Sequence, residues 1–115
     1  MHLISCRSIN GREIKRNDAV RTLVVEKDTV LVFTPTEYRI IQLLLENPIL
    51  PDRKLNETFF HVKAIDSHMR KNLERHIENI KSKIRPVRFS IRRIHLYGYS
   101  LVAEDDVLEP LASSL

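Results

Sequence analysis

Apolar residues recur along this chain with two different spacings, and the spacing predicts which secondary structure each stretch forms. Before residue 34, short runs such as "AVRTLVV" and "TVLVF" are rich in Val, Leu and Thr. Turn-forming residues separate them at Asn10-Gly11, at Asn17-Asp18 and over 26–28. Short β-branched runs separated in this way are typical of antiparallel strands. Residues 1–33 therefore predict a small antiparallel sheet, with "VVEKDTVLVF" forming a hairpin.

The next stretch, "FTPTEYRIIQLLLENP", carries the signals for the start, body and end of a helix. Thr34 can cap the helix with its hydroxyl, Pro35 suits the first position, and Glu37 completes a capping box. Asn47-Pro48 ends the helix, because the residue before proline is pushed out of the helical conformation. We predict an amphipathic helix of about three turns. Its buried side carries Tyr38, Ile41, Leu44 and Leu45, and its polar side carries Arg39, Gln42 and Glu46, which are not arranged for catalysis or binding.

Two further helices are predicted between residues 52 and 85. The first covers about 52–60, with Asp52 as its cap and Leu55 and Phe59 as an apolar pair. The second covers about 67–85, and its apolar stripe consists of Leu73, Ile77, Ile80 and Ile84. Its other face carries mostly basic and amide side chains: Arg70, Lys71, Asn72, Arg75, Asn79, Ser82 and Lys83, with Glu74 and Glu78 among them. Such a helix suits the major groove of DNA, because cations pair with phosphates and Arg or Asn can bind base edges.

After Pro86 the spacing changes to strict alternation, in "VRFSIRRIHLYGYSLV". This pattern predicts a two-stranded ribbon that turns near 93–97. Its tip would carry Arg92, Arg93, His95 and Tyr97. A basic hairpin beside a basic helix is the arrangement called a winged helix, in which the wing reaches a phosphate or the adjacent minor groove.

The distribution of charge supports a polyanionic partner. The chain has 115 residues, about one domain, and a net charge of +4. Residues 53–97 contain twelve Lys or Arg and four Asp or Glu, which gives this part +8 and leaves −4 for the rest. A basic half of this kind is expected of a protein that lays one face on nucleic acid. The alternative is a solvated basic surface without a partner.

Three partial motifs resemble the effector domain of the OmpR/PhoB family of bacterial response regulators, over roughly 23–102. The family's first helix begins Leu-Thr-x-x-Glu-Phe/Tyr-x-Leu-Leu, which 33–41 match. Its recognition helix is matched in part by Leu73, His76, Ile77, Ile80, Lys81 and Ile84. Its closing Val-Arg-Gly-x-Gly-Tyr-x-Leu is matched in part by Ile94, Gly98, Tyr99 and Leu101.

The predicted elements and the resemblance together indicate an α+β winged helix-turn-helix domain over 1–103: an N-terminal antiparallel sheet (1–33), a three-helix core (34–85) and a C-terminal β-hairpin wing (86–103). The resemblance implies sequence-specific binding of double-stranded DNA, often as two copies on a direct repeat, and regulation of transcription. Contacts from the recognition helix would fall on Lys71, Asn72, Glu74, Arg75, Glu78, Asn79 and Lys81, and contacts from the wing on Arg93, His95 and Tyr99. Arg70, Lys83 and Arg92 are further cations that could contact DNA.

Two departures from the family pattern change these expectations. The family usually has basic residues where Glu78 and Asn79 stand, and Arg-Gly where this chain has His95-Leu96. A carboxylate facing DNA costs affinity unless it accepts a hydrogen bond from cytosine N4. The family's effector domain also normally follows a receiver domain, whereas this chain begins at the sheet, so we expect a stand-alone regulator. The rival hypothesis is a winged-helix protein-interaction module, with Glu74 and Glu78 as signs of lost DNA contact.

Other classes of function are not indicated. The chain has no Gly-rich phosphate loop, HExxH motif or paired Cys motif, so we expect neither an enzyme nor a cofactor or metal site. Cys6 is expected to be a small buried side chain. Because no apolar run is long enough to cross a bilayer and no signal peptide is recognisable, we expect a cytoplasmic protein. The resemblance to bacterial DNA-binding domains implies that it is nucleoid-associated. Expected partners are duplex DNA, a second copy on that DNA, and RNA polymerase, but no membrane or small-molecule substrate. The acidic segment 104–115 is expected to be a flexible tail, or else a mask for the basic face.

Overall fold

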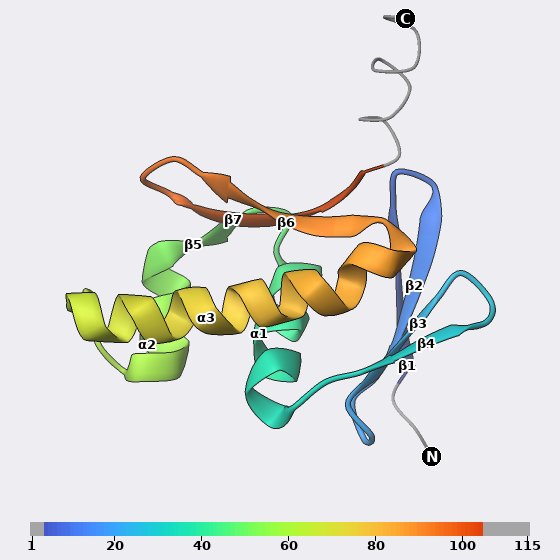
Figure 1. The fold of residues 1–115 in the computed structure, drawn as a ribbon, viewed down its shortest axis with the longest axis horizontal. Coiled ribbons are helices and arrows are strands. Elements are labelled where there is room, and N and C mark those ends of the chain that lie inside the picture. The colour runs from blue at the N-terminus through green and yellow to red at the C-terminus, as the bar shows by residue number, and fades with distance from the viewer. Residues whose placement is uncertain (1–3, 105–115) are drawn as a thin grey trace, which may run out of the picture.

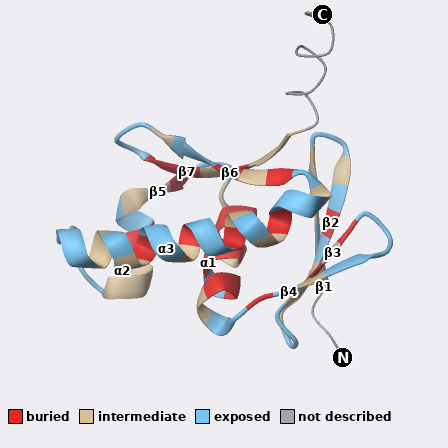
Figure 2. Ribbon diagram, in the orientation of Figure 1, coloured by how far each residue is buried: buried red, intermediate tan, exposed pale blue. Residues whose placement is uncertain are grey.

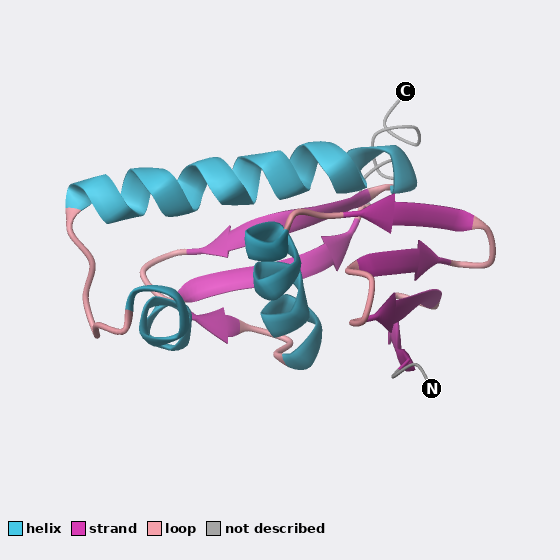
Figure 3. Cartoon of the chain, turned by 90° about the horizontal axis from the view of Figure 1, so that it is seen from below, coloured by secondary structure: helices cyan, strands magenta, loops and turns pink. Residues whose placement is uncertain are grey.

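The chain forms a mixed α+β structure in which two antiparallel sheets flank three α-helices (Figures 1 and 3). The structure is a computed structural model, and it describes residues 4–104. The elements in chain order are β1 (Ile4–Ile9), β2 (Arg12–Asn17), β3 (Thr22–Val25), β4 (Thr29–Val32), α1 (Pro35–Glu46), β5 (Leu50–Pro51), α2 (Asp52–Phe60), α3 (Ser67–Ile84), the 3₁₀ turn η1 (Arg85–Val87), β6 (Phe89–Ile94) and β7 (Gly98–Ala103). The predicted sheet, three helices and closing hairpin are all present among the described residues.

The N-terminal sheet has the strand order β1-β2-β3-β4, with every neighbouring pair antiparallel. The turn between β1 and β2 places Asn10 and Gly11 at φ 54° and 81°, the left-handed region that Asn-Gly adopts at little cost. The predicted hairpin is confirmed as β3 and β4, joined through residues 26–28. Ile14, Leu23 and Val25 are buried, so this face of the sheet packs on the rest of the molecule.

Helix α1 begins and ends where its sequence predicts. The Thr34 Oγ1 accepts from the Glu37 N–H (3.3 Å), and the Glu37 carboxylate accepts from the Thr34 N–H (3.0 Å), which completes the capping box. Its buried face is wider than predicted and includes Ile40 and Leu43, because both α3 and β7 pack against it. Figure 2 shows the buried residues gathered along this helix and on the inner side of α3.

The second sheet has the order β5-β7-β6, and its two-residue strand β5 was not predicted. Leu50 and Pro51 pair with Tyr99 and Gly98, so β5 lies beside β7 as an edge strand, near the turn of the hairpin. A Cβ atom on Gly98 would lie 1.9 Å from the Leu50 carbonyl oxygen. Gly98 is therefore required by the close approach of two backbones.

Two predictions about single residues are wrong. Asp52 does not cap α2: it is the first residue of the helix, the N-cap is Pro51 without a side-chain bond, and the Asp52 carboxylate binds Arg93 instead. Cys6 is not buried. It lies exposed on β1, where its thiol donates to the Glu13 carboxylate (3.0 Å).

In the described part of the chain, no helix combines the length and the apolar composition needed to cross a bilayer. The predicted acidic tail lies, from residue 105 onward, outside the described residues.

Candidate functional site

The rotation of α3 decides which of its side chains reach solvent. Asp66 caps the helix by accepting from the Met69 N–H (2.8 Å), and the predicted stripe of Leu73, Ile77, Ile80 and Ile84 is buried. Residues that lie opposite this stripe on the helical wheel are exposed. They include Lys71, Glu74, Arg75, Glu78 and Asn79. This outer face of α3 is the candidate site.

Charge is unevenly arranged across the outer face. Glu74 and Glu78 form one row along the helix and line a surface hollow of about 350 Å³ between α3 and the hairpin. Lys71 and Arg75 form the next row, farther from the hairpin. The sequence predicted both kinds of residue on this face, but not that the acidic row would stand between the basic row and the hairpin.

The far flank of the basic row borders a second hollow, of about 280 Å³. Its lining combines polar side chains with two phenylalanines: Thr36, Asn72, Arg75 and His76 with Phe59 and Phe60, together with Ile40 and Leu73. Asn72 thus lies on the side of α3 that faces α1 and α2, whereas Asn79 is exposed on the outer face.

Among the described residues, none pairs with the side chains of Lys71 or Arg75. Two other predicted contacts of α3 are engaged within the fold. Lys81 pairs with Glu78 (3.3 Å), so this residue of the acidic row partly neutralises the charge of Lys81. Arg70 is half-buried and lies close enough to Tyr99 to affect its pKa. The basic row therefore holds the cations of α3 that are best placed to meet a partner.

Lys83 has an internal role. Its Nζ donates to the buried Glu37 carboxylate (2.5 Å) and lies 5.7 Å from the centre of the Phe33 ring. Burial by itself disfavours the charged form of Glu37, but bonds from Lys83 and the Thr34 N–H outweigh it and lower the pKa of that carboxyl. The lysine joins the end of α3 to the start of α1.

Arg93 and Tyr99 also make contacts within the fold. Arg93 Nη1 and Nη2 donate to the two carboxylate oxygens of Asp52 (2.6 and 2.9 Å), and its guanidinium lies 4.8 Å from the centre of the Tyr99 ring. These bonds raise the pKa of Arg93. Tyr99 is 6% exposed, and burial raises the pKa of its hydroxyl. Tyr99 is thus a core residue, and Arg93 ties the hairpin to α2.

The hairpin presents other residues to solvent. Arg92 is exposed, and alternation along β6 puts it on the face of the sheet opposite Ile91 and Arg93, away from α3. His95 is exposed at the turn. Beside it stand Leu96 and Tyr97, which are 82% and 51% exposed. The predicted tip included Tyr97, but the exposed leucine was not singled out.

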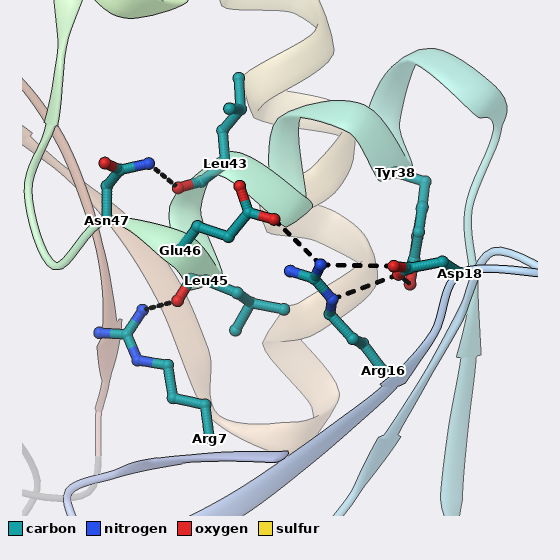
Figure 4. A network of polar contacts seen from close by, with 8 residues as sticks. All are labelled: Arg7, Arg16, Asp18, Tyr38, Leu43, Leu45, Glu46 and Asn47. Carbon is teal, nitrogen blue, oxygen red and sulfur yellow. Dashed lines mark hydrogen bonds and ion pairs between the residues drawn. The ribbon is translucent and has the colours of Figure 1, made fainter. Parts of the chain in front are cut away.

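Two arginines outside the site, Arg7 and Arg16, are structural. Arg7 donates to the carbonyl oxygens of Leu44 and Leu45 (2.8 and 2.7 Å) at the end of α1, whose last turn has no basic residue of its own. Arg16 pairs with Glu46 and Asp18 (Figure 4). Cations at a helix C-terminus are favourable, and here the sheet provides them.

Asp18 also accepts from the Tyr38 hydroxyl (2.6 Å). Burial alone would raise the pKa of Asp18, but bonds from Tyr38 and Gln42 and the charge of Arg16 outweigh it and lower that pKa. Burial and the bond to Asp18 raise the pKa of Tyr38. This network attaches the N-terminal sheet to α1.

No group of three or more His, Cys, Asp or Glu residues in the described range 4–104 is placed to hold a metal ion. No protein-family model matches the chain, and no curated protein sequence matches it.

Proposed function

We propose that the chain is a winged helix-turn-helix protein that binds specific sites in double-stranded DNA and regulates transcription. The proposal rests first on the order of the elements. A sheet, three helices and a closing hairpin follow one another as in the OmpR/PhoB-type effector domains that the sequence resembles. In this proposal α3 is the recognition helix and the β6–β7 hairpin is the wing.

The observation that carries the proposal is the basic row on α3. Lys71 and Arg75 are exposed and have no partner among the described residues, and Asn79 stands one turn beyond Arg75. An exposed lysine suits a phosphate oxygen, whereas Arg and Asn can make paired hydrogen bonds to guanine and adenine edges in the major groove. Because four buried apolar residues fix the rotation of α3, this row is presented without a conformational change.

The acidic row has a part in the same proposal. Glu74 and Glu78 would face the groove beside the basic row, where a carboxylate repels phosphate but accepts a hydrogen bond from the cytosine N4 amino group. We infer that the two glutamates lower overall affinity and favour sites with cytosine at the positions they meet. Two copies on a direct repeat remain part of the proposal.

Selection of bound fragments from sheared genomic DNA tests it. The chain should enrich a discrete site, and affinity should fall with salt with a log–log slope of about −0.9 per phosphate neutralised. Arg75→Ala should weaken binding to the selected site roughly tenfold or more, and Lys71→Ala should make the salt slope less steep by about 0.9. Arg39→Ala, which removes an exposed cation from α1, is the matched control and should leave both quantities unchanged.

A protein-interaction module is the second candidate. Two observations favour it. Lys83 and Arg93, two predicted DNA contacts, pair with Glu37 and Asp52 within the fold, and the acidic row lies beside the hairpin. Glu74→Gln with Glu78→Gln separates the two functions. A DNA-binding protein should gain affinity for unrelated duplexes and lose discrimination at cytosine. An interaction module should not bind duplex DNA at low salt, either with or without the two substitutions.

A further inference from the structure

The turn of the hairpin holds an apolar residue in an unfavourable backbone conformation. Residues 94–97 form a turn closed by the Tyr97 N–H, which donates to the Ile94 carbonyl (3.0 Å). Leu96, its third residue, has φ 55° and is 82% exposed. Leucine is disfavoured there, where Gly or Asn is usual. Among the described residues, Leu96 is the only apolar side chain on a backbone with positive φ, so the fold loses stability by exposing it.

The turn is held firmly in spite of this strain. The Asp52 N–H donates to the Tyr97 carbonyl (2.7 Å), and the Asp52 carboxylate binds Arg93 just before the turn. Strand β5 pairs with Gly98 just after it. The turn that carries Leu96 is therefore fixed to α2, and the turn end of the β6–β7 hairpin lies at the same end of the molecule as the start of α3 (Figure 1). An exposed apolar side chain on a rigid support is preorganised to insert into a partner.

We propose that Leu96, flanked by Tyr97, is an apolar wedge that enters the minor groove of duplex DNA and partly unstacks one base step. The proposal rests on the DNA-binding function proposed above and adds how the hairpin contributes to it. Apolar side chains inserted from the minor groove kink the duplex toward the major groove. Flexible pyrimidine–purine steps open at the lowest cost, so the wedge selects such a step without contacting its base edges.

The surroundings of the turn favour DNA over an apolar protein surface. His95 precedes the leucine, Arg92 stands on the adjacent strand, and both side chains are exposed. Among the described residues, no carboxylate pairs with either of them. Asp52, the acid next to the turn, is neutralised by Arg93. The wedge therefore approaches a polyanion without opposing charge at the tip.

Leu96→Asn is the decisive variant, because asparagine tolerates the same backbone conformation but removes the apolar group. With the duplex recovered by selection, it should weaken binding about tenfold, the effect of losing a buried leucine contact. The salt slope should not change, since no cation is removed. The fluorescence increase of a 2-aminopurine placed at the opened step should disappear, and the DNA bend should decrease.

Three further variants complete the experiment. Leu96→Met should keep most of the affinity of the unmodified chain, because it keeps an apolar side chain. Leu96→Gly should raise the melting temperature, because glycine relieves the backbone strain, and should weaken DNA binding, because it removes the apolar side chain. Val20→Asn, at another apolar position that is 54% exposed, should change nothing. Unchanged affinity and 2-aminopurine signal in Leu96→Asn would overturn the wedge while leaving DNA binding intact. Failure of the unmodified chain to bind duplex DNA at low salt would overturn the proposed function and the wedge together.

Discussion

At the scale of one residue, the structure explains why the hairpin has glycine at position 98. The glycine matches the end of a family pattern, yet its backbone does not have a positive φ. It is required because β5 pairs with β7 at this point, and the Leu50 carbonyl occupies the space that a Cβ atom on Gly98 would need. Arg93, Tyr97 and Tyr99, which hold the hairpin and its turn, surround this contact.

Gly98→Ala should therefore lower the free energy of unfolding by about 3 kcal/mol, the upper range for forcing an atom into a packed site. Gly11→Ala is the matched control. Nothing lies within 4 Å of its added Cβ, and only its φ of +81° opposes the change, so the loss should be about 1 kcal/mol. Urea denaturation of both variants measures the difference. Equal losses would show that β5 can move away from the hairpin.

At the scale of elements, charged side chains join segments that are far apart in sequence. Lys83 connects the end of α3 to the start of α1, Arg93 connects the hairpin to α2, and Arg7 connects β1 to the end of α1. Each cation meets a carboxylate or carbonyl group that its own element does not provide. The cations of residues 53–97 are thus divided: Lys83 and Arg93 bond to carboxylates within the fold, whereas others, Lys71 and Arg75 among them, face outward.

Lys83→Met tests this division. Without the lysine, the buried Glu37 carboxylate loses a stabilising bond, so its pKa should rise, and the free energy of unfolding should fall by about 1 kcal/mol because Lys83 is partly exposed. Carbon-detected NMR of the Glu37 carboxyl and urea denaturation measure the two effects. The salt slope of DNA binding should stay unchanged. A less steep slope would instead place Lys83 on a phosphate.

At the scale of the whole molecule, two carboxylates join the N-terminal sheet, α1 and α3. Asp18 fixes the N-terminal sheet to α1, and Glu37 fixes α1 to α3. The pKa of each is lower in the folded protein than its ordinary value of 3.8 or 4.5. A carboxyl whose pKa falls on folding stabilises the protein when it is ionised.

The stability from this pair should be fully present above the ordinary pKa values and should be lost as the pH falls through the lower, folded-state values. Urea midpoints measured from neutral pH down to about pH 2 should therefore decline steadily below the ordinary carboxyl range. Asp18→Asn with Glu37→Gln should lower the midpoint near neutrality and flatten the decline. A decline equally steep in the double variant would assign acid sensitivity to other groups.

Elements whose signals act over a few residues could be predicted from the sequence. The capping box of α1 joins Thr34 and Glu37 across one turn, the stripe of α3 repeats every three or four residues, and the hairpin alternates residue by residue. Such patterns are visible in sequence because the interacting groups are close along the chain. The bounds of α2 and the hairpin of β3 and β4 could be predicted for the same reason.

Which of the predicted site residues face outward depends on how distant segments pack, so the sequence did not predict it. Glu37 and Lys83 are 46 positions apart and Asp52 and Arg93 are 41 apart, so neither pair leaves a local signal. The burial of Tyr99, the strand β5 and the placement of the acidic row beside the hairpin likewise follow from how elements pack. Of the predicted contacts, packing leaves Lys71, Arg75 and Asn79 together on one surface, and the fold exposes Leu96 on a strained turn that no local pattern requires.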